Sequence, residues 1–286
     1  MSHPQIIAEM SAIRDEIQKV RAKGQIVGFV PTMGALHAGH LSLIEEAKKR
    51  CDVTVVSIFV NPTQFDEQHD LVNYPRDLAT DVSNLKQLSV DYVFTPSPEQ
   101  MYPSGHCISV DVGELARILE GRFRPGHFSG VATILMKLFH LIPANVAFFG
   151  KKDYQQLKVV KQVVEDSNLP IEIVGCPTVR EKDGLAMSSR NRLLTQEERQ
   201  RAKCVFESLE LAQKIADEGE RDPKNVIYKI RAHLHRADVK IDYVALVNPD
   251  TLYPEKELIE NTLALVAVRM GSIRLIDNRL IQPGAG

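Results

Sequence analysis

The sequence lacks the features that would place it in a membrane or in an oxidising compartment. No run approaches the roughly 18 consecutive apolar residues that a membrane span needs. The four cysteines are scattered, with neither C-x-x-C spacing nor a metal-ligand cluster, which is typical of reduced thiols in a cytosolic protein. The first residues show no basic region followed by an apolar core, so we expect no secretion signal.

Excess charge, repeats and low-complexity segments are also missing. The formal net charge is -2, so no global basic field would attract nucleic acid or an anionic membrane. The chain has 286 residues, of which 44% are hydrophobic and 25% charged. These values are ordinary for a soluble globular protein of one large or two modest domains. We therefore expect a cytoplasmic protein whose partners are small molecules.

Apolar patterning in the first 180 residues alternates between helices and strands. Residues 52–60 form a near-continuous, β-branched run, typical of a strand buried on both faces. Further strands are predicted at 26–30, 92–95, 108–112, 146–149 and 171–176. Helices are predicted at 10–23, 39–50, 78–88, 131–142 and 154–166 from apolar residues at helical spacing. This alternation predicts right-handed βαβ units in an α/β fold, a Rossmann-like, doubly wound parallel sheet.

The pattern changes after residue 180. A long charged helix is predicted at 195–220, a second at 223–236, and three strands at 241–247, 263–268 and 273–277. Helices followed by closely connected strands predict a separate α+β domain with an antiparallel sheet. We therefore divide the chain into a catalytic domain at 1–180 and a smaller C-terminal domain at 181–286.

The turn after the first predicted strand contains His37 and His40 on either side of Gly39. If the helix begins here, free backbone N–H groups and the helix dipole favour an anion. Gly34 and Gly39 lack a Cβ, so a phosphate chain could approach the backbone closely. A protonated or donating histidine would neutralise charge during nucleotidyl transfer. This H-x-G-H resembles the signature of the nucleotidyltransferase superfamily; the alternative is two solvated loop histidines beside structural glycines.

Ligands of open α/β sheets bind at the carboxyl ends of the strands, where more polar clusters follow. Asn61-Pro-Thr-Gln-Phe65 offers donors and acceptors for a small polar substrate, or is a capped turn. Asp81 lies one helical turn beyond Tyr74-Pro-Arg-Asp77, and a carboxylate near a triphosphate is a candidate for holding Mg²⁺. The alternative is an exposed helix carboxylate, which we favour for Asp77.

Three further clusters are rich in cations. The loop at 120–128 contains Glu120 and Arg124 and could clamp or gate an anionic substrate, or form a surface ion-pair network. Residues 149–156 combine Gly150, lysines for phosphates and a capping Asp153. Residues 187–192 supply two hydroxyls and a fixed cation, which could close on a polyphosphate and stabilise its transition state.

Together these clusters resemble the motif series of the pantothenate synthetase (pantoate–β-alanine ligase) family. They follow the family's order from Pro31 to Arg192: PTMGALHAGH, FVNPTQF, YPRD with Asp81, EGRFRPGHFSGV, FGKKDYQQL, PTVRE and DGLAMSSRN. The resemblance implies an ATP- and Mg²⁺-dependent condensation of pantoate with β-alanine through pantoyl adenylate. It also implies a homodimer and a C-terminal domain that acts as a lid.

The resemblance assigns roles residue by residue. It implies that His40 is the proton donor and that His37, Lys152, Ser188, Ser189 and Arg190 also act on the phosphates. The full ATP site would comprise Met33, Gly34, Ala35, Leu36, His37, Ala38, Gly39, His40, Gly150, Lys151, Lys152, Asp153, Val179, Met187, Ser188, Ser189 and Arg190. Substrate binding would involve Gln64 with pantoate and β-alanine, Gln156 with pantoate, and Asn61, Tyr74, Glu120 and Arg124 near β-alanine or in the gate. Asp81 would lie near the metal, and Lys151 stands where the family usually has Glu.

Two other functions stay open at this point. An adenylyltransferase of the same superfamily would act on another small acid or phosphate and stop at the adenylated product. A non-enzymatic module would bind the nucleotide only. Class I tRNA synthetases share H-x-G-H, but this chain lacks a basic tRNA face and an anticodon domain.

Overall fold

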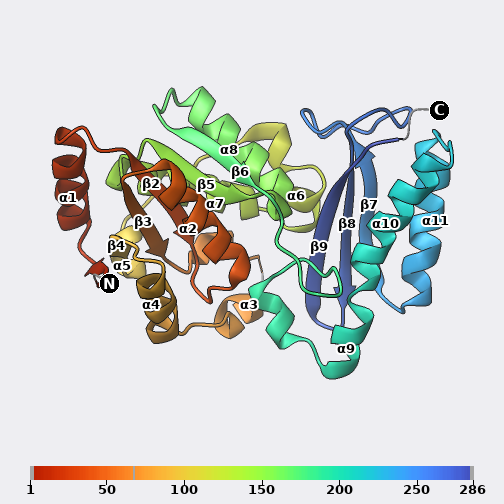
Figure 1. The fold of residues 1–286 in the computed structure, drawn as a ribbon, viewed down its shortest axis with the longest axis horizontal. Helices are drawn as coiled ribbons and strands as arrows, with labels where there is room; N and C mark the ends of the chain where they lie inside the picture. Colours follow the sequence, from red (N-terminus) through yellow and green to blue (C-terminus); the bar gives the residue numbers. More distant parts are fainter. Residues whose placement is uncertain (1–2, 67, 284–286) are drawn as a thin grey trace. The chain divides into compact units, whose positions relative to one another are not determined.

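A computed structural model describes residues 3–66 and 68–283 of the chain (Figure 1). The chain divides into two compact units, the first made of Met1–Lys151 and Gln155–Pro177 and the second of Lys152–Tyr154 and Thr178–Gly286. The units divide between Pro177 and Thr178, close to the boundary predicted between residues 180 and 181. Each unit has a hydrophobic core of its own. Among the described residues, no helix is long and apolar enough to cross a membrane.

The first unit is built on a six-stranded parallel sheet of order β1-β4-β3-β2-β5-β6. This confirms the predicted doubly wound α/β fold. The strands are β1 (Gln5–Ile7), β2 (Val27–Thr32), β3 (Val53–Ile58), β4 (Tyr92–Phe94), β5 (Val146–Gly150) and β6 (Glu172–Cys176). Edge strand β1 was not predicted, because three residues carry too little periodicity to recognise.

Helices cover both faces of this sheet, and neighbouring residues of a strand face opposite cores. Phe29 packs in a core with α1 and α7, whereas Val30 packs in another with α2 and α4. The helices are α1 (Met10–Ala22), α2 (Ala38–Arg50), α3 (Gln68–Asn73), α4 (Leu78–Gln87), α5 (Pro98–Met101), α6 (Glu120–Phe123), α7 (His127–Leu141) and α8 (Tyr154–Asp166), with 3₁₀ turns η1 (Pro62–Gln64), η2 (Gly113–Ala116) and η3 (Lys151–Asp153).

The second unit contains an antiparallel sheet covered by helices, as predicted. Its strands β7 (Lys240–Val247), β8 (Thr262–Met270) and β9 (Ile273–Ile281) lie in chain order. Apolar residues of α10 (Cys204–Asp217) and α11 (Pro223–Arg236) pack on it, including the fully buried Leu209 and Ile230. The helix predicted at 195–220 is two helices, α9 (Gln196–Arg201) and α10, separated by Ala202 and Lys203. The turn η4 (Ser189–Leu193) precedes them.

The prediction of a strand at 108–112 is wrong. This segment has no regular secondary structure, and the Val110 N–H donates to Thr133 Oγ1 on α7 (2.9 Å) rather than to a neighbouring strand. Val110 and Val112 pack against a small cluster around Phe128. The alternating pattern therefore reflects packing on a helix.

The strand order reverses between β2 and β5, which is where such folds bind their ligands. From β2 the chain proceeds through β3 to β4 on one side, whereas β5 leads to β6 on the other. At a switch point of this kind the connections diverge and leave a crevice at the carboxyl ends of the strands. The loop after β2 and residue Gly150 at the end of β5 lie there, so the fold places two of the predicted nucleotide clusters at the favoured edge.

Candidate active site

The loop after β2 turns sharply because two consecutive residues have positive φ, 81° at Gly34 and 50° at Ala35. An alanine in this conformation needs support from its surroundings. Thr32 Oγ1 donates to the Ser57 carbonyl (2.7 Å) and accepts from the Gly34 N–H (3.1 Å). A Cβ on Gly34 would lie 2.9 Å from Asp81 Oδ2. The glycine is therefore required both by the turn and by the approach of a carboxylate.

Asp81 anchors this loop from α4. Its Oδ2 accepts from the Ala35 N–H (2.9 Å) and its Oδ1 from the Leu36 N–H (2.8 Å), and the residue is only 2% exposed. Bonds from a carboxylate to backbone amides are strong away from water. The sequence placed Asp81 near a metal, but both of its oxygens are engaged with the main chain. No group of three or more metal-binding side chains occurs in residues 3–66 and 68–283. In this structure Asp81 therefore acts as the anchor of the loop after β2.

The two histidines cap α2 with their own rings. His37 Nδ1 accepts from the Gly39 N–H (3.1 Å), and His40 Nδ1 accepts from the His37 N–H (3.4 Å). Their ring centroids are 4.1 Å apart. A ring nitrogen that accepts from a backbone N–H carries no proton, so each neutral imidazole carries its proton on Nε2. The rings therefore present Nε2–H as a donor at the positive end of a helix.

Gln64, on η1 after β3, has both ends of its amide engaged. Its Oε1 accepts from Asn61 Nδ2 (3.2 Å), and its Nε2 lies 2.7 Å from Met33 Sδ. Asn61, only 1% exposed, also donates to the Gly130 carbonyl (3.1 Å) and accepts from Tyr102 Oη (2.8 Å). These contacts make Asn61 a support for Gln64, and they connect the predicted substrate residue Gln64 to the predicted nucleotide residue Met33.

Arg124 and His127 fix the backbone of Gln64. Arg124 Nη1 lies 3.1 Å from His127 Nε2, and since a guanidinium only donates, this ring nitrogen accepts. His127 Nδ1–H then donates to the Gln64 carbonyl (2.7 Å), which also accepts from Arg124 Nη2 (3.3 Å). Arg124 therefore acts on Gln64 through its main chain, together with a histidine that was not among the predicted site residues.

The other predicted substrate residues of the first unit differ in their surroundings. Glu120 is buried, and its N–H donates to Gln155 Oε1 (3.0 Å). Tyr74 is buried and packs edge to face on Phe65, with ring centroids 5.7 Å apart. Gln156 is half-buried on α8. Glu120 is thus a buried rather than a surface carboxylate, whereas Arg124 of the same loop forms an ion pair with Asp66 (3.4 Å).

The second unit carries further predicted nucleotide residues on a tight hairpin. The Val179 carbonyl accepts from the Met187 N–H (3.0 Å), so the hairpin brings these two residues together. Ser188 follows and caps η4, its Oγ accepting from the Arg190 N–H (3.3 Å), and Ser189 is buried. The Ser-Ser-Arg segment is therefore already ordered as one turn.

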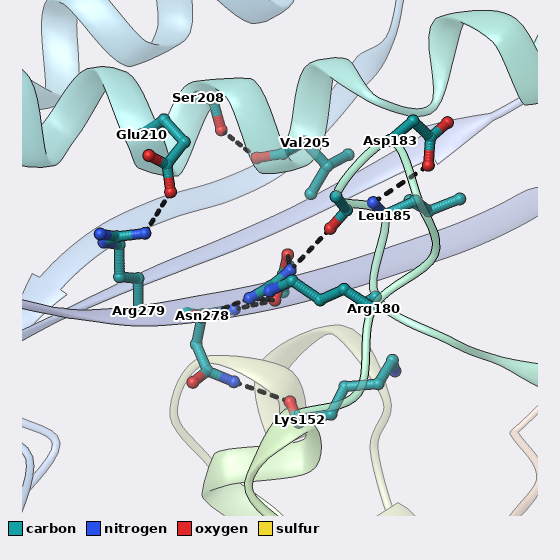
Figure 2. Close-up of polar contacts among 12 residues, drawn as sticks. Lys152, Arg180, Asp183, Leu185, Val205, Ser208, Glu210, Asn278 and Arg279 are labelled. Carbon is teal, nitrogen blue, oxygen red and sulfur yellow. Dashed lines mark hydrogen bonds and ion pairs between the residues drawn. The ribbon is translucent and has the colours of Figure 1, made fainter. Parts of the chain in front are cut away.

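The segment after β5 completes the predicted nucleotide residues. Gly150 ends the strand, and Lys151 beyond it is exposed. In the second unit, Lys152 Nζ lies 3.6 Å from Asp153 Oδ1, and the Lys152 carbonyl accepts from Asn278 Nδ2 of β9 (2.8 Å; Figure 2). Lys152 is thus tied to the C-terminal sheet by its main chain.

The residues that sequence reasoning missed are supports that contact the predicted ones. Most of them are polar side chains at buried positions, which require a hydrogen-bonding partner. They are Thr32, Tyr102, Gln155, Arg180, Asp277 and Asn278.

Comparisons with known proteins cover nearly the whole chain. A family model described as Pantoate-beta-alanine ligase matches residues 5–280. Pantothenate synthetase from Aquifex aeolicus (strain VF5) is 49% identical over 281 residues, which are 98% of this chain and 99% of that protein. Pantothenate synthetase from Thermus thermophilus has been solved by crystallography and is 41% identical in sequence to this chain. The two structures match with a TM-score of 0.93 over 98% of this chain and 100% of that chain.

A second solved structure was determined with ligands. Pantoate-beta-alanine ligase from Francisella tularensis, complexed with beta-gamma ATP and beta-alanine, is 38% identical with a TM-score of 0.83 over 97% of each chain. The region matched by the family model includes every polar cluster from Pro31 to Arg192. On these matches, the chain belongs to the pantoate–β-alanine ligase family.

Proposed function

We propose that the protein condenses pantoate with β-alanine to pantothenate at the expense of ATP. A pantoate carboxylate oxygen attacks the α-phosphorus of ATP, and the bond from this phosphorus to the oxygen that bridges the α- and β-phosphates breaks. The products are pantoyl adenylate and pyrophosphate. The neutral amine of β-alanine then attacks the acyl carbon, the bond to AMP breaks, and the amine loses a proton to solvent. Activation is needed because a carboxylate is a poor electrophile, whereas AMP is a good leaving group.

The observation that carries this proposal is the pair of oriented imidazoles at the switch point of the sheet. His37 and His40 are fixed through Nδ1, so their Nε2–H groups are donors at the start of α2. Donors oriented before the reaction stabilise charge that develops on a phosphate without further reorganisation. The Francisella tularensis relative, complexed with beta-gamma ATP and beta-alanine, supports ATP and β-alanine as substrates of this chain.

The remaining roles follow from the family and from the contacts described above. Gln64 binds pantoate and β-alanine from a position fixed by Asn61 and Met33. Gln156 binds pantoate. In the second unit, the residues proposed to donate hydrogen bonds to the phosphates of ATP are Lys152, Ser188, Ser189 and Arg190.

Magnesium is proposed to enter with ATP. Mg²⁺ keeps several of its waters and binds readily to substrate phosphates, so it needs few protein ligands. Asp81 is the carboxylate proposed to lie near the metal, and each of its oxygens also accepts one backbone N–H group. We assign no step of the reaction to a metal ligand from this chain.

Two wider properties are proposed from the family alone. We expect a cytoplasmic homodimer with the second unit acting as a lid. Sedimentation equilibrium at micromolar concentration would report the mass of the assembly, and a monomer at every concentration would contradict the dimer.

The adenylyltransferase alternative is not favoured by the family match, and one assay separates the three functions. ATP, Mg²⁺ and pantoate should release pyrophosphate, whereas AMP and pantothenate should appear only after β-alanine is added. Pyrophosphate without any pantothenate would favour an adenylyltransferase. No pyrophosphate from a folded protein that binds ATP would favour a binding module.

A further inference from the structure

Two adjacent residues of β9, Asp277 and Asn278, contact the two nucleotide segments of the second unit. Figure 2 shows Asn278 beside Lys152. Asp277 and Asn278 are 3% and 8% exposed and interrupt an otherwise largely apolar strand that includes the buried Leu275 and Ile281. Polar groups at buried strand positions require partners. Here the partners are segments that carry proposed phosphate-binding residues.

Asn278 fixes the main chain at Lys152. Its Nδ2 donates to the Lys152 carbonyl over 2.8 Å, although the two residues are 126 positions apart in the sequence. The Asn278 N–H in turn donates to Asp277 Oδ1 (2.8 Å), which couples the two residues. The backbone from which the Lys152 side chain extends is therefore set by β9.

Asp277 fixes the hairpin at residues 179–187 through Arg180. The guanidinium donates to both carboxylate oxygens of Asp277 (2.5 and 3.1 Å), to the Gly184 carbonyl (3.0 Å) and to the Asn278 carbonyl (3.4 Å). It also lies over the Phe206 ring, 4.8 Å from the centroid. A bidentate pair of this kind specifies orientation as well as distance.

The hairpin leads directly into the Ser188–Arg190 segment. Arg180 pairs with Ala186 in an antiparallel bridge, one position inside the bond that joins Val179 to Met187. Gly184 at the tip has a φ of 90°, and a Cβ there would lie 2.1 Å from the Phe206 ring. The hairpin is therefore docked closely on α10, and Arg180 is one of its polar attachments.

We propose that Asp277 and Asn278 are positioning residues for the nucleotide. From neighbouring positions on one strand they set where Lys152 lies relative to Ser188, Ser189 and Arg190, so that both segments meet one polyphosphate. The inference rests on the proposed function. Neither side chain needs to touch ATP, because each acts through its partner: Asn278 through one carbonyl and Asp277 through a whole hairpin.

The primary test is Asn278→Asp, which keeps the shape of the side chain but removes the donor and turns an acceptor toward the Lys152 carbonyl. We expect the KM for ATP to rise about tenfold, from the cost of an unmatched buried polar group, with the KM for pantoate unchanged. Asp277→Asn should raise the KM for ATP similarly. In Arg180→Lys, which keeps the charge but loses the fork, hydrogen exchange at the Met187 amide should also accelerate.

Val226→Ala provides the control for stability alone. Val226 is fully buried on α11 in the same unit, so its truncation lowers stability without altering either nucleotide segment. Its KM for ATP should match that of the wild type at temperatures where all variants are folded. An increase equal to that of Asn278→Asp would overturn the inference, as would an unchanged KM for ATP in both β9 variants. If Asn278→Asp does not fold, the KM for ATP is measured for Asn278→Ala instead, with the same expected rise.

Calorimetric titration with ATP separates this inference from the proposed function. A wild-type protein that binds ATP but makes no pantothenate would end the proposed function. The positioning role of Asp277 and Asn278 would then be tested by the ATP affinity of their variants alone. That affinity should fall about tenfold, which is about the cost of one unmatched buried polar group. If pantothenate is made and the variants bind ATP as tightly as the wild type, only the positioning role fails.

Discussion

The nucleotide loop of the first unit and the hairpin of the second are fixed by different kinds of contact. In the first unit the supports act on the main chain: the buried Asp81 carboxylate accepts two backbone N–H groups, and the partly buried rings of His37 and His40 accept two more. In the second unit the hairpin is attached by arginine forks to carboxylates, including Arg180 with Asp277.

A further fork on the hairpin is more open to solvent. Arg199 donates to Glu181 (2.5 Å) and to Asp183 (2.6 Å), and these side chains are 29 to 37% exposed. Salt screens exposed pairs of this kind but has little effect on buried carboxylate–amide bonds. The loop of the first unit should therefore be insensitive to ionic strength, whereas the hairpin should respond to it.

The largest expected effect concerns the first unit. His40→Ala removes both an Nε2–H donor and the cap on the His37 N–H, so adenylate formation should fall by about 100-fold or more. Pantoate binding should change little, because it is assigned to Gln64 and Gln156. Pyrophosphate release and a pantoate titration measure the two effects. Survival of half the activity would show that the proposed electrostatic role is wrong.

A matched pair of substitutions sharpens this result. In His40→Gln the amide nitrogen can occupy the ε position, whereas in His40→Asn an amide oxygen can replace the Nδ1 cap. If the Nε2–H donor matters most, the glutamine variant should keep more activity than the asparagine variant. The opposite order would make the helix cap the dominant contribution of His40.

Asp81→Asn tests whether the first-unit loop depends on its carboxylate. An amide can accept only one of the two backbone N–H bonds with its oxygen, and its NH₂ group would oppose the other. We expect kcat/KM for ATP to fall about tenfold, as for a buried donor left without its acceptor. Asp77→Asn is the control on the same helix, because Asp77 is an N-cap and asparagine caps equally well. A specific rise in the Mg²⁺ requirement, with ATP affinity intact, would support a metal role for Asp81.

Gln64→Ala should have a smaller and different effect. This change removes the amide supported by Asn61 and Met33, so the KM values for pantoate and β-alanine should both rise, by about fivefold to tenfold for a lost hydrogen bond. Gln156→Ala should raise the KM for pantoate alone. If Gln64→Ala left both KM values unchanged, Gln64 would not belong to the substrate site.

The two units also differ in how much of their fold and site could be predicted from the sequence. The chemistry proposed for the first unit is local: His37, Gly39 and His40 lie within one turn of helix after a strand, so the motif, the helix cap and the proposed anion site coincide. The sheet was predictable because β-branched runs alternate with helical periods. The role of Asp81 was not, since its partners Ala35 and Leu36 lie about 45 residues away and are backbone groups that no motif shows.

The supports of the second unit were harder still to predict. The predicted strand ended at Asp277, whereas β9 continues to Ile281 and places Asn278 against Lys152. Nothing local to Asn278 indicates that partner. The 108–112 segment failed for a related reason, because an alternating pattern reports that one side of a segment is buried but not which element buries it.

The smallest expected effect is the response of the hairpin to acid. Hydrogen bonding to Arg199 lowers the pKa of Asp183 from its usual 3.8, so the ionised form is favoured in the folded state. Its contribution is complete above the unfolded pKa and is lost as pH falls through the lower folded pKa, that is, in acid below about pH 4. Because Asp183 is partly exposed, the contribution should be at most about 1 kcal/mol. Thermal melting should therefore separate wild type from Asp183→Asn slightly at pH 6, and the difference should shrink toward pH 3. A difference that stayed constant with pH would mean that the charge of Asp183 does not stabilise the hairpin, and the contrast between the two units would then rest on Arg180 alone.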